Sequence, residues 1–216
     1  SYILRQSKCL SFEAPYIYLL IGEEKALLMD TGATESDVEF PQYQTVKQLI
    51  DVNTAGAKNK AILVVHSHSH GDHYRGDSQF VGKPNVTLIE ANSKAVKQFY
   101  GFNDDVESMS TIELGNRSVT VIQTPGHQEE AVAIYDSKTK WLLTGDTFYP
   151  GYVYVKNWAD YKSSINRLVE FSSAHEVSAI LGTHIEMTKT PGEFYPIGTT
   201  YQPEEASLEL LVPDLK

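Results

Sequence analysis

Four histidines and one aspartate lie within eight positions of this chain, in the stretch from His66 to His73. Neutral imidazole nitrogens and carboxylate oxygens are the donors that borderline divalent metals such as zinc prefer. Side chains two positions apart on an extended segment point to the same side, so we expect His68 and His70 to bind one metal ion. Asp72 and His73 follow the next turn and can face a second metal ion. The spacing therefore predicts a metal site rather than an ordinary solvated loop.

A run of apolar residues, Ala61–Val65, comes directly before these histidines. Its β-branched valines and its abrupt change to polar residues predict a buried strand whose C-terminal end opens into the metal-binding loop. His66 also fits the two-residue period, but a register that began there would place Ser69 or His70 at the position of the acidic ligand. We therefore interpret His66 as a residue that packs against the ligands or supports them.

Further donor side chains follow other predicted strands. His127, Asp146 and His184 each come one or two positions after a glycine that ends a strand. A carboxylate has two oxygens, so Asp146 can bridge two metal ions. Asp30 follows the predicted strand 26–29 and is interpreted as a carboxylate that orients a metal-bound histidine.

The order His68-x-His70-x-Asp72-His73 resembles the His-x-His-x-Asp-His motif of the metallo-β-lactamase superfamily. Four later or earlier motifs match in the family's order: Met29-Asp30-Thr31-Gly32, Thr124-Pro125-Gly126-His127, Thr144-Gly145-Asp146-Thr147 and Gly182-Thr183-His184. The resemblance runs from about Tyr16 to His184. It implies an α/β fold of the four-layer αβ/βα sandwich type, in which two mixed sheets are flanked by helices and the metals lie at one edge of the sheets.

The resemblance also implies a complete set of ligands. One metal ion would be held by His68, His70 and His127, the other by Asp72, His73 and His184, and Asp146 would bridge them. Two Zn²⁺ ions are implied, with iron or manganese as alternatives. The implied enzyme is a dinuclear metallo-hydrolase, in which a hydroxide between the metals attacks the carbonyl of a small ester, lactone, thioester or amide, and Asp72 and Asp146 are thereby also catalytic.

The residues at two positions, Asp146 and Tyr149, indicate which branch of hydrolases this chain resembles most. Zinc β-lactamases have Cys or Ser where this chain has Asp146, so β-lactamase activity is less favoured than the glyoxalase II, lactonase and phosphodiesterase branches. Acyl-homoserine lactonases have a tyrosine three positions after the bridging aspartate, and Tyr149 lies there. Tyr149 is therefore a candidate to donate a hydrogen bond to the substrate carbonyl. Glyoxalase II carries a further helical domain for glutathione, which we do not expect in the short segment after His184.

An oxidoreductase is the alternative from another class. The superfamily includes mononuclear-iron sulfur dioxygenases, which resemble this chain in their three-histidine site and leave the second site empty. A metal-binding protein without catalysis is a third interpretation, which the full ligand set disfavours. The identity of the metal separates the first two: two zinc ions favour hydrolysis and one iron favours oxygenation.

The composition of the chain limits the kinds of molecule that it is expected to bind. The 216 residues carry a net charge of −10, which disfavours nucleic acid and anionic membrane surfaces and leaves a small-molecule substrate. No apolar run approaches the roughly 18 residues of a membrane span. A single cysteine, Cys9, excludes an intrachain disulfide. The compartment and the oligomeric state stay open.

Periodicity and turn residues predict the remaining elements within one domain over residues 1–216. Hairpins are expected at 16–29, 111–122 and 131–144, a strand at 177–181, helices at 42–52, 92–100 and 160–172, and a short helix near 75–80. Asn92 should cap the second of these helices, with Ala95, Val96 and Phe99 on its inner side.

Polar connections are expected at 53–60 and 102–109. Residues 190–216 should pack as an extended arm, with a short helix at 204–211. The aromatic segment 148–155 and Trp158 have two equally favoured interpretations. They form the wall of a pocket, which would include Tyr152 and Tyr154, or they pack against the rest of the chain.

Overall fold

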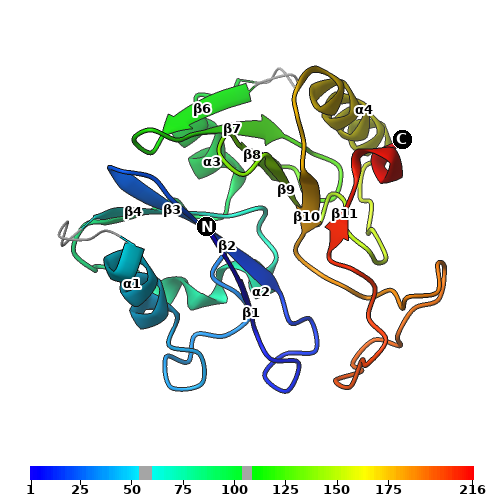
Figure 1. Ribbon diagram of the computed structural model, residues 1–216, viewed down its shortest axis with the longest axis horizontal. Coiled ribbons are helices and arrows are strands. Elements are labelled where there is room, and N and C mark those ends of the chain that lie inside the picture. Colours follow the sequence, from blue (N-terminus) through cyan, green and yellow to red (C-terminus); the bar gives the residue numbers. More distant parts are fainter. Residues whose placement is uncertain (54–59, 104–108) are drawn as a thin grey trace.

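Two mixed β-sheets form the centre of the molecule (Figure 1). The computed structural model describes residues 1–53, 60–103 and 109–216. The first sheet has the strand order β1-β2-β3-β4-β5, and the second has the order β11-β10-β9-β8-β7-β6. The first comprises β1 Tyr2–Arg5, β2 Tyr16–Ile21, β3 Lys25–Met29, β4 Ala61–Val65 and β5 Val86–Leu88. The second comprises β6 Met109–Glu113, β7 Ser118–Gln123, β8 Val132–Asp136, β9 Trp141–Gly145, β10 Ala179–Gly182 and β11 Glu209–Leu210.

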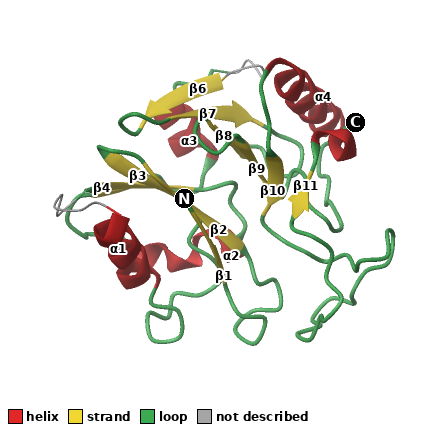
Figure 2. Ribbon diagram, viewed as in Figure 1, coloured by secondary structure: helices red, strands yellow, loops and turns green. Residues whose placement is uncertain are grey.

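Helices cover the outer face of each sheet and complete four layers (Figure 2). Helix α1, Gln42–Asn53, buries Val46 and Ile50 against the first sheet. Helix α4, Trp158–Ala174, buries Leu168 and Phe171 against the second. The shorter helical segments are α2 Gly71–Tyr74, η1 Arg75–Gln79, α3 Ser93–Tyr100 and η2 Val212–Leu215. The predicted sandwich of two mixed sheets flanked by helices is therefore confirmed.

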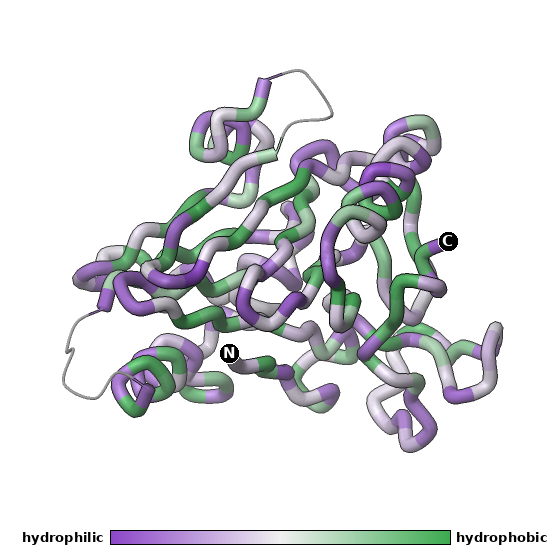
Figure 3. The backbone as a smooth tube through the Cα atoms, turned by 45° about the horizontal axis from the view of Figure 1, so that its top comes forward, coloured by the Kyte–Doolittle hydropathy of each residue, from purple (hydrophilic) through white to green (hydrophobic). Residues whose placement is uncertain are grey.

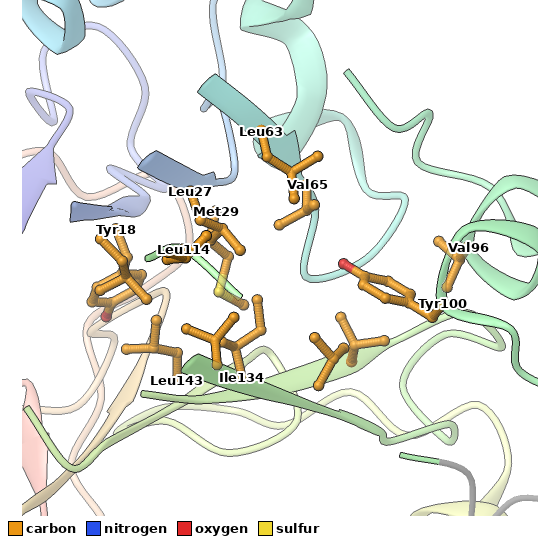
Figure 4. Packing of buried hydrophobic residues seen from close by; sticks show 14 of the residues in the cluster. Tyr18, Leu27, Met29, Leu63, Val65, Val96, Tyr100, Leu114, Ile134 and Leu143 are labelled. Atoms are coloured by element: carbon orange, nitrogen blue, oxygen red, sulfur yellow. The ribbon is translucent and has the colours of Figure 1, made fainter. Parts of the chain in front are cut away.

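The core lies between the two sheets, where side chains of both meet (Figure 4). Tyr18, Leu20 and Met29 of the first sheet pack there with Ile134 and Leu143 of the second. The alternate residues of β2 face the opposite layer and join the cluster under α1. Because both faces of these strands are buried, their sequences are continuously apolar rather than alternating. Figure 3 shows the same pattern as hydrophobic strands joined by hydrophilic turns.

The predicted hairpins and main helices are present, with small shifts of their ends. Asn92 caps α3, because its side chain accepts a hydrogen bond of 2.9 Å from the amide of Ala95. One prediction for this helix is wrong: Phe99 is exposed, and Val96 and Tyr100 are the buried residues. Val96 and Tyr100 are four residues apart and so share one face of the helix, which leaves Phe99 at the edge of that face.

The predicted helix at 204–211 is also wrong. Leu210 pairs with Ile180 in an antiparallel ladder, so this segment adds strand β11 to the edge of the second sheet, and η2 follows it. Strand β1, which pairs with β2, has no counterpart in the predictions. Most of the connections expected at 53–60 and 102–109 lies outside the described residues. Within the described part of the chain, no helix is long and apolar enough to span a membrane.

A buried ion pair links the two sheets at the edge opposite to the ends of β4 and β9. Arg117 donates from Nε and Nη2 to the two carboxylate oxygens of Asp136, at 2.7 Å each, and from Nη1 to the carbonyl of Ile21 at 3.0 Å. Burial favours the neutral form of Asp136, but Arg117 and Thr139 more than offset it and lower the pKa of this carboxyl. The arginine therefore joins β8 of one sheet to β2 of the other.

Replacement of Arg117 by methionine should lower the free energy of unfolding by about 3–5 kcal/mol, because it leaves the Asp136 carboxylate buried without a partner. Urea denaturation at pH 7 measures this loss, and the Arg117→Met/Asp136→Asn double variant should recover part of it. Because the pKa of Asp136 lies below its ordinary value of 3.8, its contribution is present above that pH and is lost as the pH falls below it. A loss below about 1 kcal/mol would contradict the assignment.

Candidate metal centre

The candidate ligands converge at one edge of the sandwich because several strands end there. Strands β3 and β4 run parallel, as do β9 and β10, so their carboxyl ends meet at common edges of the two sheets. The histidine-rich stretch follows β4, His127 follows β7, Asp146 follows β9 and His184 follows β10. Segments that are far apart in the sequence thereby bring their side chains together.

His68, His70 and His127 form the first group of candidate ligands. The Nε2 atoms of His68 and His127 lie 3.2 Å apart, and the Nδ1 atom of His70 lies 3.0 Å from the first and 3.1 Å from the second. A tetrahedral zinc ion with Zn–N bonds of about 2.0–2.1 Å would separate its nitrogen ligands by about 3.3–3.4 Å. The triangle of nitrogens is therefore close to one face of a tetrahedral metal site.

Asp72, His73 and His184 form the second group. The Nε2 atoms of the two histidines lie 3.3 Å apart. The Oδ2 atom of Asp72 lies 3.3 Å from Nε2 of His73 and 3.2 Å from Nε2 of His184. This triangle has almost the same dimensions as the first. Its mixed nitrogen and oxygen donors, without sulfur, suit zinc, iron or manganese.

Asp146 lies between the two groups. Its Oδ2 atom is 3.5 Å from Nε2 of His68 and 3.7 Å from Nε2 of His73, and its Oδ1 atom is 3.4 Å from Nε2 of His184. One carboxylate thus contacts histidines of both groups, as a bridging ligand must. Gly145 permits this approach, because a Cβ atom there would lie 2.7 Å from Cβ of Ser67.

In three of the histidine rings, the hydrogen bond made by Nδ1, on the side away from the other candidate ligands, determines which nitrogen carries the proton. The Nδ1 atom of His127 lies 2.6 Å from the carbonyl oxygen of Tyr154, and that of His184 lies 3.0 Å from the carbonyl oxygen of Glu13. That of His73 lies 2.8 Å from Oδ2 of Asp30. Since carbonyl and carboxylate oxygens only accept, we assign the proton to Nδ1, which leaves the lone pair of Nε2 directed at the other ligands. Donor atoms that converge in this way from several rings fit divalent metal ions.

Asp30 supports both groups from beneath. It is fully buried and accepts hydrogen bonds from the Ser67 amide at 2.7 Å, the Ser67 hydroxyl at 2.8 Å and the His73 ring at 2.8 Å. The Ser67 hydroxyl in turn lies 3.0 Å from Nδ1 of His68. The position of Asp30 agrees with the interpretation of this residue as a carboxylate that orients ligands.

The ionisable groups of the site strongly perturb one another. Burial favours neutral Asp146, but His184, His73 and His68 outweigh it and hold the pKa of this carboxyl well below its ordinary range. Burial opposes the charged form of His184, but Asp146 and Asp72 raise its pKa to about 9. Carboxylates that stay ionised beside these rings are suited to bind a metal at neutral pH.

His66 lies outside both groups, as predicted. Its Nδ1 atom is 2.9 Å from the carbonyl oxygen of Ile89, and its Nε2 atom is 2.9 Å from Oδ1 of Asp77. Asp77 also accepts a hydrogen bond of 2.8 Å from the hydroxyl of Thr31. These contacts tie the start of the histidine-rich stretch to η1 and to the end of β3.

Tyr149 is buried beside the metal centre, and its ring meets that of His184 edge-on. Its hydroxyl donates a hydrogen bond to the carbonyl of Tyr152 and lies 3.2 Å from Oε2 of Glu186. The hydroxyl is therefore engaged by the protein, and its contact with a substrate stays a prediction.

A cavity of about 210 Å³ opens next to the candidate ligands. Of the aromatic residues predicted for a pocket wall, Tyr149 and Tyr154 line it, whereas Tyr152 stacks on Phe194 and Trp158 on Tyr161. The remaining residues that line it, apart from candidate ligands, are Phe12, Glu13, Glu186 and Ile197. These four were missed because they lie in irregular segments that carry no periodicity or motif.

Comparison with known proteins decides the family. Residues 10–173, most of the chain, match the family described as "Metallo-beta-lactamase superfamily". The chain belongs to this superfamily. The resemblance identified from the motifs is thereby confirmed.

Relatives within the superfamily include hydrolases. Human "Acyl-coenzyme A thioesterase MBLAC2" is 25% identical over 205 residues, which cover 78% of this chain and 72% of the relative. A "Hydroxyacylglutathione hydrolase" of Francisella philomiragia is 29% identical over 134 residues, which cover 62% of this chain and 47% of the relative. The chain thus spans about half the length of this hydroxyacylglutathione hydrolase.

Solved structures of the superfamily fold agree with this assignment. ETHE1 from Myxococcus xanthus has a TM-score of 0.59 at 18% identity, covering 90% of this chain and 78% of its own. A metallo-beta-lactamase from Pontibacter korlensis has a TM-score of 0.54 at 20% identity, covering 79% of each chain. At these identities the likeness concerns the fold alone.

Replacement of Asp30 by asparagine should weaken metal binding by about 10–100-fold, because an amide cannot accept all the hydrogen bonds that orient His73 and Ser67. Titration of zinc into metal-free protein in competition with a chromogenic chelator measures this affinity. Asp51→Asn, on the exposed face of α1, is the matched control. A zinc affinity within about twofold of the wild type in a folded Asp30→Asn variant would contradict the role of Asp30.

Proposed function

We propose that this protein is a dinuclear metal-dependent hydrolase, most readily a zinc enzyme, that cleaves a thioester or a related small ester, lactone or amide. The observation that carries the proposal is the pair of adjacent ligand groups, with Asp146 lying 3.5 Å from His68 of the first and 3.4 Å from His184 of the second. A site for one metal ion would need only the first group, whereas here the second has the same donor spacing. Two adjacent sites of this kind lie about 3.5–4 Å apart in hydrolytic enzymes.

The thioester is favoured by the names of the relatives. An acyl-coenzyme A thioesterase and a hydroxyacylglutathione hydrolase both act on an acyl group attached to a thiol carrier. The cavity of about 210 Å³ is smaller than the roughly 300–1,000 Å³ of pockets that enclose a whole ligand. We therefore propose a small-molecule substrate of which the acyl portion enters the cavity and the carrier stays outside. The net charge of −10 supports the exclusion of nucleic acid from the proposed partners.

The chain's own residues prepare the site for this chemistry. Two bound divalent ions supply Lewis acidity and lower the pKa of bound water to about 7. Asp72 and Asp146 supply the negative charge that balances part of the metal charge. Asp30 and the carbonyl groups of Tyr154 and Glu13 hold the histidine rings in one tautomer, so that little reorganisation is needed when the substrate arrives.

Elemental analysis of protein purified without added metal, combined with a panel of small thioesters, esters and lactones, tests the proposal. We expect about two zinc ions per chain and turnover of thioesters. Treatment with a chelator should abolish this turnover, and added zinc should restore it. One iron ion per chain without hydrolysis of any substrate would contradict the proposal and favour the sulfur dioxygenase alternative.

Replacement of Asp146 by alanine should lower the rate of hydrolysis at least about 100-fold, because the two metal ions lose the ligand between them. Steady-state kinetics at saturating zinc measures the rate, and circular dichroism establishes that the variant is folded. Asp37→Ala, which removes an exposed aspartate, should keep wild-type kinetics. Wild-type turnover in folded, metal-replete Asp146→Ala would refute the bridging role.

A further inference from the structure

The walls of the cavity beside the candidate ligands come from two segments of irregular structure. The loop between β1 and β2 contributes Phe12 and Glu13, and the segment after β10 contributes Glu186 and Ile197. Arg5 and Glu205 join these segments, since both terminal nitrogens of the arginine donate to the carboxylate, at 2.6 and 2.7 Å. Lys8 lies 3.0 Å from the same carboxylate. Both walls are therefore held in place before a substrate binds.

Glu186 is fixed in its wall by the backbone amide of Tyr152, with the Tyr149 hydroxyl close by. Its Oε2 atom accepts a hydrogen bond of 2.7 Å from the amide of Tyr152 and lies 3.2 Å from the hydroxyl of Tyr149. Gly151 makes room for this arrangement, because a Cβ atom there would lie 2.7 Å from Oε2 of Glu186 and 2.3 Å from the ring of Tyr149. Both contacts are made with Oε2, which leaves Oε1 to face other groups.

Glu13 is held by its backbone rather than by its side chain. Its carbonyl oxygen accepts from Nδ1 of His184, which places this half-buried residue directly beside the metal centre. Among the residues that the structure describes, none donates a hydrogen bond to the Glu13 carboxylate. A carboxylate in this position is free to bind a group of the substrate.

Aromatic faces lie beside the two carboxylates. Phe12 and Tyr154 line the same cavity, and both are partly exposed. No lysine or arginine is among the described residues that line the cavity. Carboxylates combined with aromatic faces are the groups that bind ammonium and quaternary ammonium ions.

We infer that the substrate of the proposed hydrolase carries a positively charged amine or quaternary ammonium group close to its scissile carbonyl, and that Glu13 and Glu186 bind this group. The inference rests on the proposed function. In the reaction, the C–S bond of the thioester breaks, a C–O bond forms with water, and the proton of the water passes to the departing thiolate or to the solvent. Acyl groups that carry a carboxylate near the carbonyl are repelled by the same two side chains.

Three thioesters of N-acetylcysteamine test this inference with metal-replete protein. Their acyl groups are trimethylammonioacetyl, its uncharged isostere 3,3-dimethylbutanoyl, and the anionic succinyl group. The first two have nearly the same shape, so the ratio of their kcat/KM values reports the charge, and comparison between variants removes the difference in their intrinsic reactivity. Glu13→Gln/Glu186→Gln should lower this ratio at least about tenfold, which corresponds to 1.4 kcal/mol. Glu170→Gln, on the exposed face of α4, should leave it unchanged.

Binding of the matching amides supplies a measurement that does not depend on turnover. By titration calorimetry, trimethylammonioacetamide should bind wild-type protein at least about tenfold more tightly than 3,3-dimethylbutanamide, and the double variant should lose this difference. Glu186→Gln alone keeps an oxygen acceptor for Tyr152, so it serves if the double variant does not fold. Hydrolysis of the uncharged thioester with an unchanged ratio in the double variant would overturn the inference and leave the proposed function intact. Hydrolysis of none of the three thioesters, and of none of the thioesters, esters and lactones in the panel above, would refute the proposed function, and equal binding of the two amides would refute the inference.

Discussion

The convergence of imidazole nitrogens and carboxylate oxygens on two adjacent points is the constraint on which the rest of this structure depends. In the first group the three imidazole nitrogens lie 3.0–3.2 Å apart, and in the second the two nitrogens and the Asp72 oxygen lie 3.2–3.3 Å apart. The protein must therefore fix the rings in this arrangement. It does so with acceptors on the far side of the rings, among which Asp30 contacts His73 directly and His68 through Ser67.

The sandwich supplies the rigidity that these acceptors need. Strands such as β2 are buried on both faces, one against the opposite sheet and the other under α1, so the strand ends that carry the ligands have little freedom to move. Arg117 and Asp136 fix the sheets at the other edge. The irregular segments around the candidate ligands form the cavity.

Sequence reasoning located the candidate ligands and most elements for identifiable physical reasons. The spacing of His68, His70, Asp72 and His73 is local and follows a strand, so its geometry could be inferred directly. The inclusion of His127, Asp146 and His184 in the same centre depended on the family resemblance, because only the fold brings them to it.

The errors have equally specific causes. Strand β11 is two residues long and pairs with β10 at the edge of the sheet. In α3 the apolar residues Val96, Phe99 and Tyr100 are adjacent on the helix surface, so the pattern alone does not decide which of the last two is buried. Glu13 and Glu186 could not be found, since a carboxylate in an irregular loop gives no sign of what it faces. The proposed substrate preference is thus the property that the sequence alone conceals most completely.

The central claim is that two metal ions occupy adjacent sites that share Asp146. Anomalous diffraction at the zinc absorption edge, from crystals of protein saturated with zinc, tests it most directly. We expect two peaks about 3.5–4 Å apart, one bonded to His68, His70 and His127 and the other to Asp72, His73 and His184, with Asp146 in contact with both. A single peak on the three histidines, with Asp146 turned away from the metal, would contradict it.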